Sequence, residues 1–314
     1  KERYNNHLFF SDRSVRMFSY QHVFHAGNHA DVLKHVVLVQ TLLYTCRKET
    51  PFFYIDTHAG AGVYSLEGAA ARKKAESDNG IGKIGSEKTV PGPIESYLQE
   101  VRRINPDGKL RFYPGSPRIA DNVLRGGDRL RLYELHPTEN HLLEANCRAW
   151  TAQNTKDDRS RSGRGKRITV EKKDGFSALK SLLPPPFRRA VVLIDPPYED
   201  KTDYRKVIET VSDALKRFST GTYLVWYPLL QRPQSRQLAG RLKQVTGQEW
   251  LNVTLSVGKP VPDGSGFVSS GMFVINPPWK LDEALREAMP YLVAVLGQNE
   301  GAGFTLETGK GSLR

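Results

Sequence analysis

The chain has very little cysteine: its 314 residues include only Cys46 and Cys147. Two cysteines without a metal-binding spacing exclude a disulfide framework and a cysteine-based zinc site, and they fit a reducing compartment. Long apolar runs are also absent, because no stretch approaches the roughly 20 apolar residues that a membrane-spanning helix needs. No signal-peptide pattern opens the sequence. We therefore expect a soluble protein of the cytoplasm, with an organelle left open.

Positive charge exceeds negative charge, with 46 Lys and Arg against 34 Asp and Glu and a net charge of +12. Such a field concentrates phosphates, which favours a polyanionic partner. A basic surface that only aids solubility is an equally good explanation of charge alone. The contents of 39% hydrophobic and 25% charged residues predict a globular protein. Its length fits one large domain with an insertion, or two modest domains.

Strand patterns alternate with helix patterns along most of the chain. The first helix is expected after Asn28, a suitable N-cap, and is followed by a buried strand at 52–56 and a glycine turn at 57–62. Further strands are expected at 129–135, 167–172, 190–195 and 221–228, and further helices at 117–125, 138–150, 177–183, 204–218 and 235–245. This alternation predicts a doubly wound α/β fold with a mostly parallel sheet, whose ligands lie at the carboxyl ends of the strands.

Other segments depart from this alternation. Residues 1–16 have no sustained periodicity and are interpreted as an extension. Residues 63–111 are too long for a connector and have a helical pattern only at 94–104, so they predict a small inserted helical subdomain in a main domain of residues 17–62 and 112–314. Strand patterns at 251–257 and 271–276 predict an antiparallel hairpin at the sheet edge.

Acidic residues mark the ends of the first four strands of the expected sheet: Asp56, Glu134, Asp174 and Asp195. A nucleoside with an amine-bearing tail needs acceptors for its ribose hydroxyls, its exocyclic amine and its ammonium, and it needs a close backbone approach at a glycine turn. S-adenosylmethionine has these groups. For any single acid a helix N-cap is the commoner explanation, so the argument depends on their repetition along one rim.

The stretch IDPPYED (Ile194–Asp200) has more unusual residues than the end of a strand requires, because one proline suffices to end a strand. We therefore looked for a chemical role of its acid, its two prolines and its tyrosine. The amine of adenine is a poor nucleophile, since its lone pair is delocalised into the ring. If Asp195 and the carbonyl of Pro196 accept its two N–H bonds, that lone pair is freed toward an incoming methyl group. The prolines preorganise the carbonyl, and Tyr198, expected to be exposed, can stack on the target base.

The tetrad D-P-P-Y (Asp195–Tyr198) resembles motif IV of the amino-methyltransferases, which methylate exocyclic amines of nucleobases. A more extensive and more specific resemblance covers residues 17–281 and includes the blocks MFSYQHVFHAGNHADVLKH, YIDTHAGAGVY, YPGSP, LYELHP, KDGF, IDPPYE, KTDY and INPPWKL. In this combination the chain resembles the RlmJ family of bacterial 23S ribosomal RNA adenine-N6 methyltransferases. The resemblance implies a Rossmann-like fold and N6-methylation of an unstacked adenine.

The resemblance also implies site residues. S-adenosylmethionine would be the cofactor, in a site lined by His35, His58, Gly60, Ser116, Glu134, Asp174, Gly175 and Asp195. Glu134 would bind the ribose, and Asp174 would lie near the cofactor adenine. Catalysis is assigned to Asp195, Pro196 and Tyr198, and contact with RNA to Tyr20, Lys34 and Tyr198. The expected partner is large-subunit ribosomal RNA, free or in an early assembly intermediate, and the enzyme is expected to be a monomer without metal or membrane.

Several alternatives stay open. The basic stretch at 156–173 looks like an expansion of a shorter family connection, and it is either a contact to RNA phosphates or a solvated loop. The stretch Asn276–Trp279 could pass for a second amine clamp, but it follows the edge hairpin, so we expect Trp279 to be structural. His25, His29 and His35 lack a metal-binding spacing. Two other functions are an amino-methyltransferase acting on DNA or guanine, and a catalytically inactive RNA-binding assembly factor.

Overall fold

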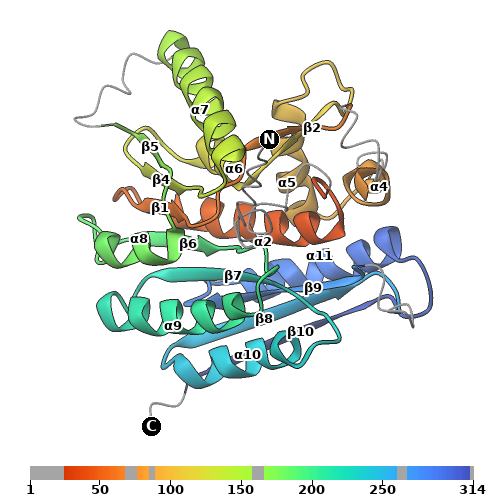
Figure 1. Ribbon diagram of the computed structural model, residues 1–314. Helices are drawn as coiled ribbons and strands as arrows, with labels where there is room; N and C mark the ends of the chain where they lie inside the picture. Colours follow the sequence, from red (N-terminus) through yellow and green to blue (C-terminus); the bar gives the residue numbers. More distant parts are fainter. Residues whose placement is uncertain (1–24, 68–75, 85–88, 158–165, 260–266, 312–314) are drawn as a thin grey trace, which may run out of the picture.

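An eight-stranded sheet forms the centre of the molecule in the computed structural model, which describes residues 25–67, 76–84, 89–157, 166–259 and 267–311. The strand order is β10-β8-β9-β7-β6-β1-β4-β5. The five strands from β7 to β5 are parallel, and β9, β8 and β10 continue the sheet in antiparallel pairs (Figure 1). The prediction of a Rossmann-like α/β fold with a mostly parallel sheet and an antiparallel edge is therefore confirmed.

The strands of this sheet agree closely with the sequence patterns. They are β1 (Phe53–Asp56), β4 (Arg129–Tyr133), β5 (Ile168–Glu171), β6 (Ala190–Ile194), β7 (Thr222–Pro228), β8 (Glu249–Ser256), β9 (Ser269–Ile275) and β10 (Gly303–Lys310). In β6 all five residues are buried, and alternate side chains enter two different hydrophobic clusters. A strand buried on both faces is typical of a parallel sheet with helices on each side.

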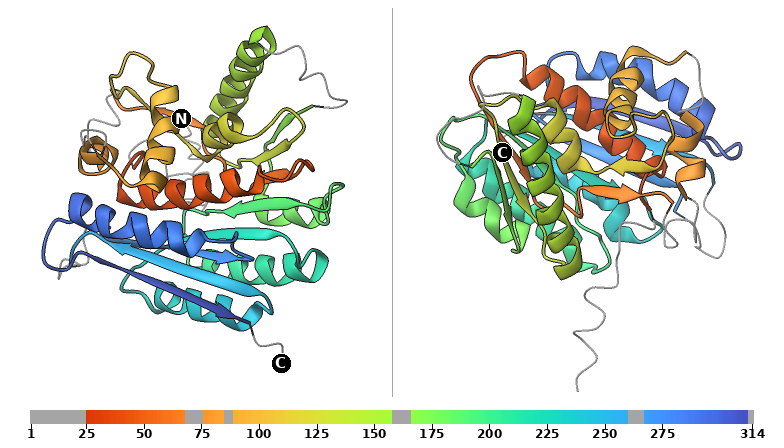
Figure 2. Two further views of the ribbon diagram at one scale, coloured as in Figure 1. Left: turned by 180° about the vertical axis from the view of Figure 1, so that it is seen from behind. Right: turned by 90° about the horizontal axis from the view of Figure 1, so that it is seen from above.

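Helices cover both faces of the sheet (Figures 1 and 2). On one face lie α2 (His29–Thr45), α6 (Ser116–Val123), α7 (Pro137–Asp157) and α11 (Leu281–Leu296), and on the other lie α8 (Gly175–Leu182), α9 (Thr202–Arg217) and α10 (Pro233–Val245). Among the described residues, none of the helices is both long enough and apolar enough to cross a membrane.

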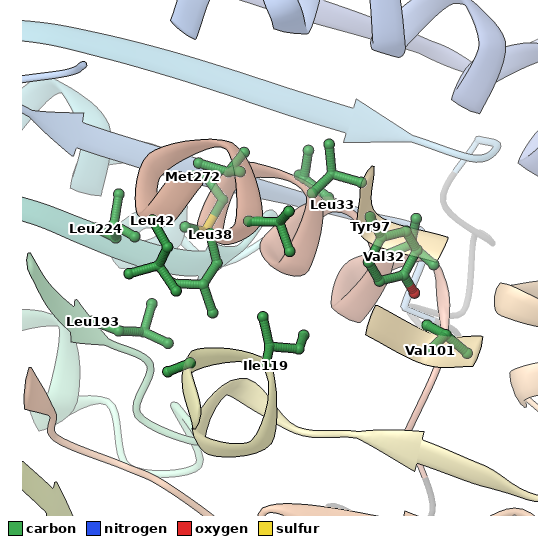
Figure 3. Close-up of a cluster of buried hydrophobic side chains, with 14 of the residues drawn as sticks. Val32, Leu33, Leu38, Leu42, Tyr97, Val101, Ile119, Leu193, Leu224 and Met272 are labelled. Carbon is green, nitrogen blue, oxygen red and sulfur yellow. The ribbon is translucent and has the colours of Figure 1, made fainter. Parts of the chain in front are cut away.

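Helix α2 is the central helix of its layer. Asn28 caps it, as predicted, by accepting hydrogen bonds from the backbone N–H groups of Ala30 and Asp31. Its apolar side chains are buried nearly all round, as expected for a helix enclosed by other elements. Figure 3 shows Leu38 and Leu42 of this helix beside side chains of the sheet. The burial of α2 fixes the positions of the polar residues in its first two turns.

The segment at 63–111 begins and ends at one small sheet, because β2 (Val63–Ser65) pairs antiparallel with β3 (Phe112–Pro114). Between them lie η2 (Glu76–Asn79), α4 (Ile81–Ile84) and α5 (Gly92–Arg103). Helix α5 confirms the helical pattern expected there. Apolar residues of α4 and α5 belong to the same cluster as α2, and Tyr97 and Val101 are seen in Figure 3. The division into a main domain and an inserted subdomain stays a prediction.

The antiparallel edge extends further than the sequence patterns indicated. The hairpin of β8 and β9 is present, with β9 beside β7. Beyond it, α11 and the outermost strand β10 were not predicted. Pro290 interrupts the helical pattern of α11, and β10 exposes side chains on both faces, so neither has a clear apolar periodicity.

Candidate functional site

The chain reverses its direction of winding at β1. From β1 it passes to β4 and β5 on one side, and it returns to β6 on the other side. In open α/β sheets, ligands bind at such a switch point, beyond the carboxyl ends of the strands. Asp56 is the last residue of β1, and Asp195 directly follows the adjacent strand β6. The candidate site is therefore the rim that these two acids share.

Asp56 is fully buried at the base of this rim. Its Oδ2 accepts hydrogen bonds from the Tyr54 hydroxyl at 2.8 Å and from the Ser116 hydroxyl at 2.7 Å, and its Oδ1 accepts one from the backbone N–H of His58 at 3.3 Å. Burial raises the pKa of Asp56 to about 6, although these donors oppose the rise. Ser116, expected near the cofactor, is thus placed at the rim by Asp56.

The glycine turn at 57–62 is joined to the end of β4 through Glu134. One carboxylate oxygen accepts the backbone N–H of Gly60 at 2.8 Å, and the other accepts that of His136 at 2.7 Å. Gly60 has a φ of +57°, and a Cβ there would lie 2.1 Å from the Tyr64 hydroxyl, so a larger residue is excluded. Burial raises the pKa of Glu134. The structure thus brings together Glu134 and Gly60, two of the residues that the family resemblance implies for the cofactor site.

Asp174 and Gly175 lie where α8 approaches the end of β1. Asp174 is the N-cap of α8 and accepts two backbone N–H groups at 3.3 Å each. A Cβ on Gly175 would lie 1.9 Å from the carbonyl oxygen of Thr57, so the two backbones are in direct contact. His58 lies edge-on to Phe176, with ring centroids 4.8 Å apart, and burial lowers the pKa of its imidazole to about 4. His58 is therefore neutral at pH 7.

Asp195 is linked to α2 by a buried ion pair. The Lys34 ammonium lies 2.7 Å from a carboxylate oxygen of Asp195 and 2.7 Å from one of Asp31. The side chain of Lys34 is only 7% exposed. Burial lowers the pKa of Lys34, but the two carboxylates outweigh this effect and hold it above the usual value. The Asp31 carboxylate also accepts the backbone N–H of Gly27 at 3.0 Å, which anchors the cluster to the start of α2.

The expectation that Tyr198 is exposed is wrong. A positive φ of 53° turns the chain after the two prolines, and the phenol is only 3% exposed. Its hydroxyl donates to the carbonyl of Trp226 at 2.8 Å, and its ring lies 4.6 Å from that of Tyr204. Burial raises the pKa of Tyr198. In this conformation Tyr198 fixes the loop that carries Asp195 and Pro196 to β7, and its stacking on a base stays a prediction.

The remaining expected residues have different placements. His35 is 1% exposed, and its Nδ1 lies 2.8 Å from the Tyr113 hydroxyl of β3. Tyr20 lies outside the described residues, as do residues 1–16 and the central part of the basic stretch, 158–165. Sequence reasoning missed Asp31, although its spacing of three residues from Lys34 on a helix was a signal. In the described ranges, no group of three or more metal-ligating side chains is found.

The second candidate clamp lies at the opposite rim. Strand β9 is antiparallel to β7, with Ile275 beside Tyr223, so Asn276 lies at the amino ends of the parallel strands. This position agrees with the choice of Asp195. The expectation that Trp279 is structural is wrong, because its side chain is 71% exposed. The loop turns at Asn276 and Lys280, both with positive φ, and the indole is directed to solvent.

Known proteins match this chain along most of its length. The model of the family described as ribosomal RNA large subunit methyltransferase D, RlmJ, matches residues 49–307. The ribosomal RNA large subunit methyltransferase J of Escherichia coli K12 is 44% identical over 276 residues, covering 88% of this chain and 93% of that protein. The protein of the same name from Haemophilus influenzae is 42% identical over 292 residues, covering 93% of this chain and 98% of that protein.

A solved structure agrees with the fold. A protein from Legionella pneumophila superposes with a TM-score of 0.79 and is 32% identical, covering 91% of this chain and 98% of that one. The family model covers well over half of the sequence, and both methyltransferases are aligned over nearly their full length. The chain therefore belongs to the family described as ribosomal RNA large subunit methyltransferase D, RlmJ.

Proposed function

We propose that this protein transfers the methyl group of S-adenosylmethionine to N6 of an adenine in large-subunit ribosomal RNA. Membership of the RlmJ family supports a ribosomal RNA methyltransferase. The observation that carries the finer proposal is Asp195, which follows β6 at the switch point and is held by Lys34 at 2.7 Å. A ribosomal RNA substrate also agrees with the expected cytoplasmic location.

The groups along the rim fit this cofactor. Glu134 directly follows β4 and lies beside the glycine turn, where a carboxylate can accept hydrogen bonds from ribose hydroxyls. Each of its oxygens accepts one backbone N–H and has a second lone pair for such a bond. Gly60 provides the positive φ that the turn after β1 requires, and its backbone N–H joins this turn to Glu134. Asp174 and the neutral His58 would enclose the base, and the Asp195 carboxylate would face the ammonium. When bound, S-adenosylmethionine supplies a methyl group that is already electrophilic.

The chain's own residues would orient the target amine. Asp195 and the carbonyl of Pro196 accept the two N–H bonds of N6, which directs its lone pair toward the methyl carbon. Lys34 fixes the Asp195 carboxylate without blocking its second oxygen, because the ion pair uses Oδ2. The methyl carbon would become bonded to N6, S-adenosylhomocysteine would be the leaving group, and the methylated amine would release one proton to solvent. The adenine must be unstacked, because N6 cannot reach this position inside a helix.

Mass spectrometry of nucleosides tests this proposal and its alternatives. Ribosomal RNA and DNA would be incubated with isotope-labelled S-adenosylmethionine and digested. We expect labelled N6-methyladenosine from large-subunit ribosomal RNA. Labelled methylguanine, or product only in DNA, would show a different amino-methyltransferase. If the RNA is bound but no product forms with any substrate, the chain is a binding or assembly factor.

A further inference from the structure

The sheet has a second rim at the amino ends of its parallel strands, opposite Asp195. We define this amino rim as residues 47–50, 188–189, 216–221 and 276–280, which precede β1, β6 and β7 or follow β9. Strand register places them in one row, since Phe53 pairs with Ala190, Val191 with Thr222, and Tyr223 with Ile275. Nothing in the proposed methyl transfer uses this row.

Exposed cations are frequent on the amino rim. Arg47, Lys48, Arg188 and Lys216 are exposed, and none of them forms an ion pair among the described residues, although Lys216 lies near Asp213, which is paired with Arg217. The acid Glu49 lies in the same turn as the first two. The Arg189 guanidinium donates to the carbonyls of the turn that ends α2 rather than to an acid, so its charge is not neutralised. A row of uncompensated cations attracts a polyanion.

Trp279 lies at one end of this row and is 71% exposed. Its loop is held by the Asn276 side chain, which donates to the carbonyls of Ser219 and Gly221 at 2.7 Å each. The Thr222 hydroxyl donates to the carbonyl of Asn276 at 3.0 Å. Two prolines and the positive φ of Asn276 and Lys280 further restrict the backbone. A fixed loop that directs a large aromatic ring into water is suited to contact with another molecule.

Backbone conformations with positive φ are also concentrated on this rim. Of the four described non-glycine residues with positive φ, three belong to it: Arg188, Asn276 and Lys280. The fourth is Tyr198 in the candidate site. Strained residues persist where the surrounding structure holds them and are concentrated at functional positions. Arg188 is an exposed cation, whereas the Lys280 ammonium is paired with Glu283 at 3.1 Å, so of these three residues Arg188 is the one suited to meet an anion.

We propose that the amino rim is a second contact surface for the RNA substrate, in which the cations hold phosphates and Trp279 stacks on an unpaired nucleobase. Stacking on an aromatic ring accepts any base, and phosphate contacts are independent of sequence. The seven residues of β7, at roughly 3.3 Å each, separate the two rims by roughly 20 Å. The amino rim therefore binds a part of the RNA remote from the target adenine. This inference rests on the proposed RNA substrate.

The stacking contact is tested with Trp279→Ala, with Phe304→Ala as the matched control. Phe304 is 38% exposed on β10, beside Leu255 and away from the amino rim. Binding of large-subunit ribosomal RNA would be measured by fluorescence anisotropy without cofactor. We expect Trp279→Ala to raise the dissociation constant about fivefold or more. Trp279→Phe and Phe304→Ala should stay within about twofold of the wild type.

The phosphate contacts are tested with Arg47→Gln/Lys48→Gln. The control is Lys109→Gln/Lys259→Gln, which removes the same charge from exposed positions elsewhere. Losing two phosphate contacts should make the slope of log affinity against log salt shallower by about 1.5. The control variant should retain the wild-type slope. The Trp279 variants and the Arg47→Gln/Lys48→Gln variant should both retain kcat on a short oligonucleotide that reaches only the rim with Asp195.

Each outcome distinguishes this inference from the proposed function. Unchanged RNA binding in both the Trp279 and the Arg47/Lys48 variants would overturn the amino rim as an RNA contact. If sedimentation shows a wild-type dimer that Trp279→Ala dissociates, the occupant is a second copy of the chain and the RNA assignment is wrong. If the variants weaken RNA binding while the wild type methylates nothing, the proposed methyl transfer fails and the contact surface stands.

Discussion

Lys34 is a single cation held between two carboxylates in the interior. Its ammonium lies 2.7 Å from both Asp31 and Asp195, whose side chains are 2% and 15% exposed. Two carboxylates this close repel each other, so the cation between them sets where Asp195 can point. The position of Asp195 at the end of β6 thus depends on a residue 161 positions away in the sequence. The family resemblance implies that Lys34 contacts RNA, which stays a prediction, and in this structure Lys34 pairs with two carboxylates.

We predict that Lys34→Met lowers the free energy of unfolding by about 3 kcal/mol, because it leaves the buried carboxylate of Asp31 and the partly buried carboxylate of Asp195 without a counter-charge. Urea unfolding at pH 7 measures the change. The control is Lys206→Met, since Lys206 is 44% exposed and pairs with Asp203, and its loss should be below about 1 kcal/mol. Equal small losses in the two variants would show that the buried cluster contributes little to stability.

Asp195→Asn should abolish most turnover while preserving the shape of the side chain. An amide nitrogen would replace one acceptor oxygen with a donor, which opposes an N–H of the target amine, and it would also leave Lys34 with one fewer carboxylate. Methylation is measured at saturating S-adenosylmethionine, and cofactor affinity is determined alongside because Asp195 is also proposed to face the cofactor tail. A near wild-type rate under these conditions would falsify the amine clamp.

At the scale of elements, the contact between β1 and α8 depends on a glycine. Gly175→Ala would place a methyl group 1.9 Å from the carbonyl oxygen of Thr57, so α8 must move away from β1. We expect a loss of stability of more than about 2 kcal/mol. Gly240 in α10 has nothing within 4 Å of an added Cβ, so Gly240→Ala should stabilise by about 0.5–1 kcal/mol. Thermal unfolding compares the pair, and two variants of equal stability would contradict the close contact.

The N-terminus of α2 is predicted to make stability depend on pH. Burial lowers the pKa of His29 to about 4, although Glu76 and Asp31 oppose the shift. As the pH falls, His29 of the unfolded chain binds a proton before His29 of the folded chain does. The contribution of neutral His29 to the free energy of unfolding is therefore fully present above pH 6.5 and is lost as the pH falls toward 4. From pH 7 to pH 5 this loss is about 2 kcal/mol.

His29→Gln isolates this contribution, because the amide does not titrate. The variant should lose about 2 kcal/mol less stability than the wild type between pH 7 and pH 5. The control is His141→Gln, which replaces an exposed histidine of α7 and should follow the wild-type curve. Urea unfolding at the two pH values provides the comparison. If His29→Gln also follows the wild-type curve, His29 is not held neutral by the fold.

For the whole molecule, the sequence predicted the order of layers better than the details of the site. The alternation of strands and helices follows from local periodicity, and strand ends such as Asp56 and Glu134 were therefore placed correctly on one rim. The burial of Tyr198 depends on a positive φ and on a carbonyl of β7, neither of which is a local pattern. The same holds for Trp279, whose exposure follows from contacts with residues 219–222.

Net charge is a property of the whole molecule, and the basic stretch at 156–173 contributes to it. Six Lys and Arg residues lie between Lys156 and Arg167, and the last of them has a structural role. The Arg167 guanidinium is paired with buried Asp121 and also donates to the carbonyl of Leu124. Arg167 therefore supports the fold, and its replacement would confuse loss of RNA contact with loss of stability.

The final prediction uses cations of this stretch other than Arg167. Replacing Arg159, Arg161, Arg164 and Lys166 by Gln should lower RNA affinity and make the salt slope shallower by about 3, since each phosphate contact contributes roughly 0.7–0.9. Affinity for S-adenosylmethionine, measured by calorimetry, should not change, because Glu134 and Gly60 are untouched. RNA binding between low and physiological salt provides the slope. An unaltered slope would favour a solvated loop, and the positive charge that meets the RNA would then have to come from surfaces such as the amino rim.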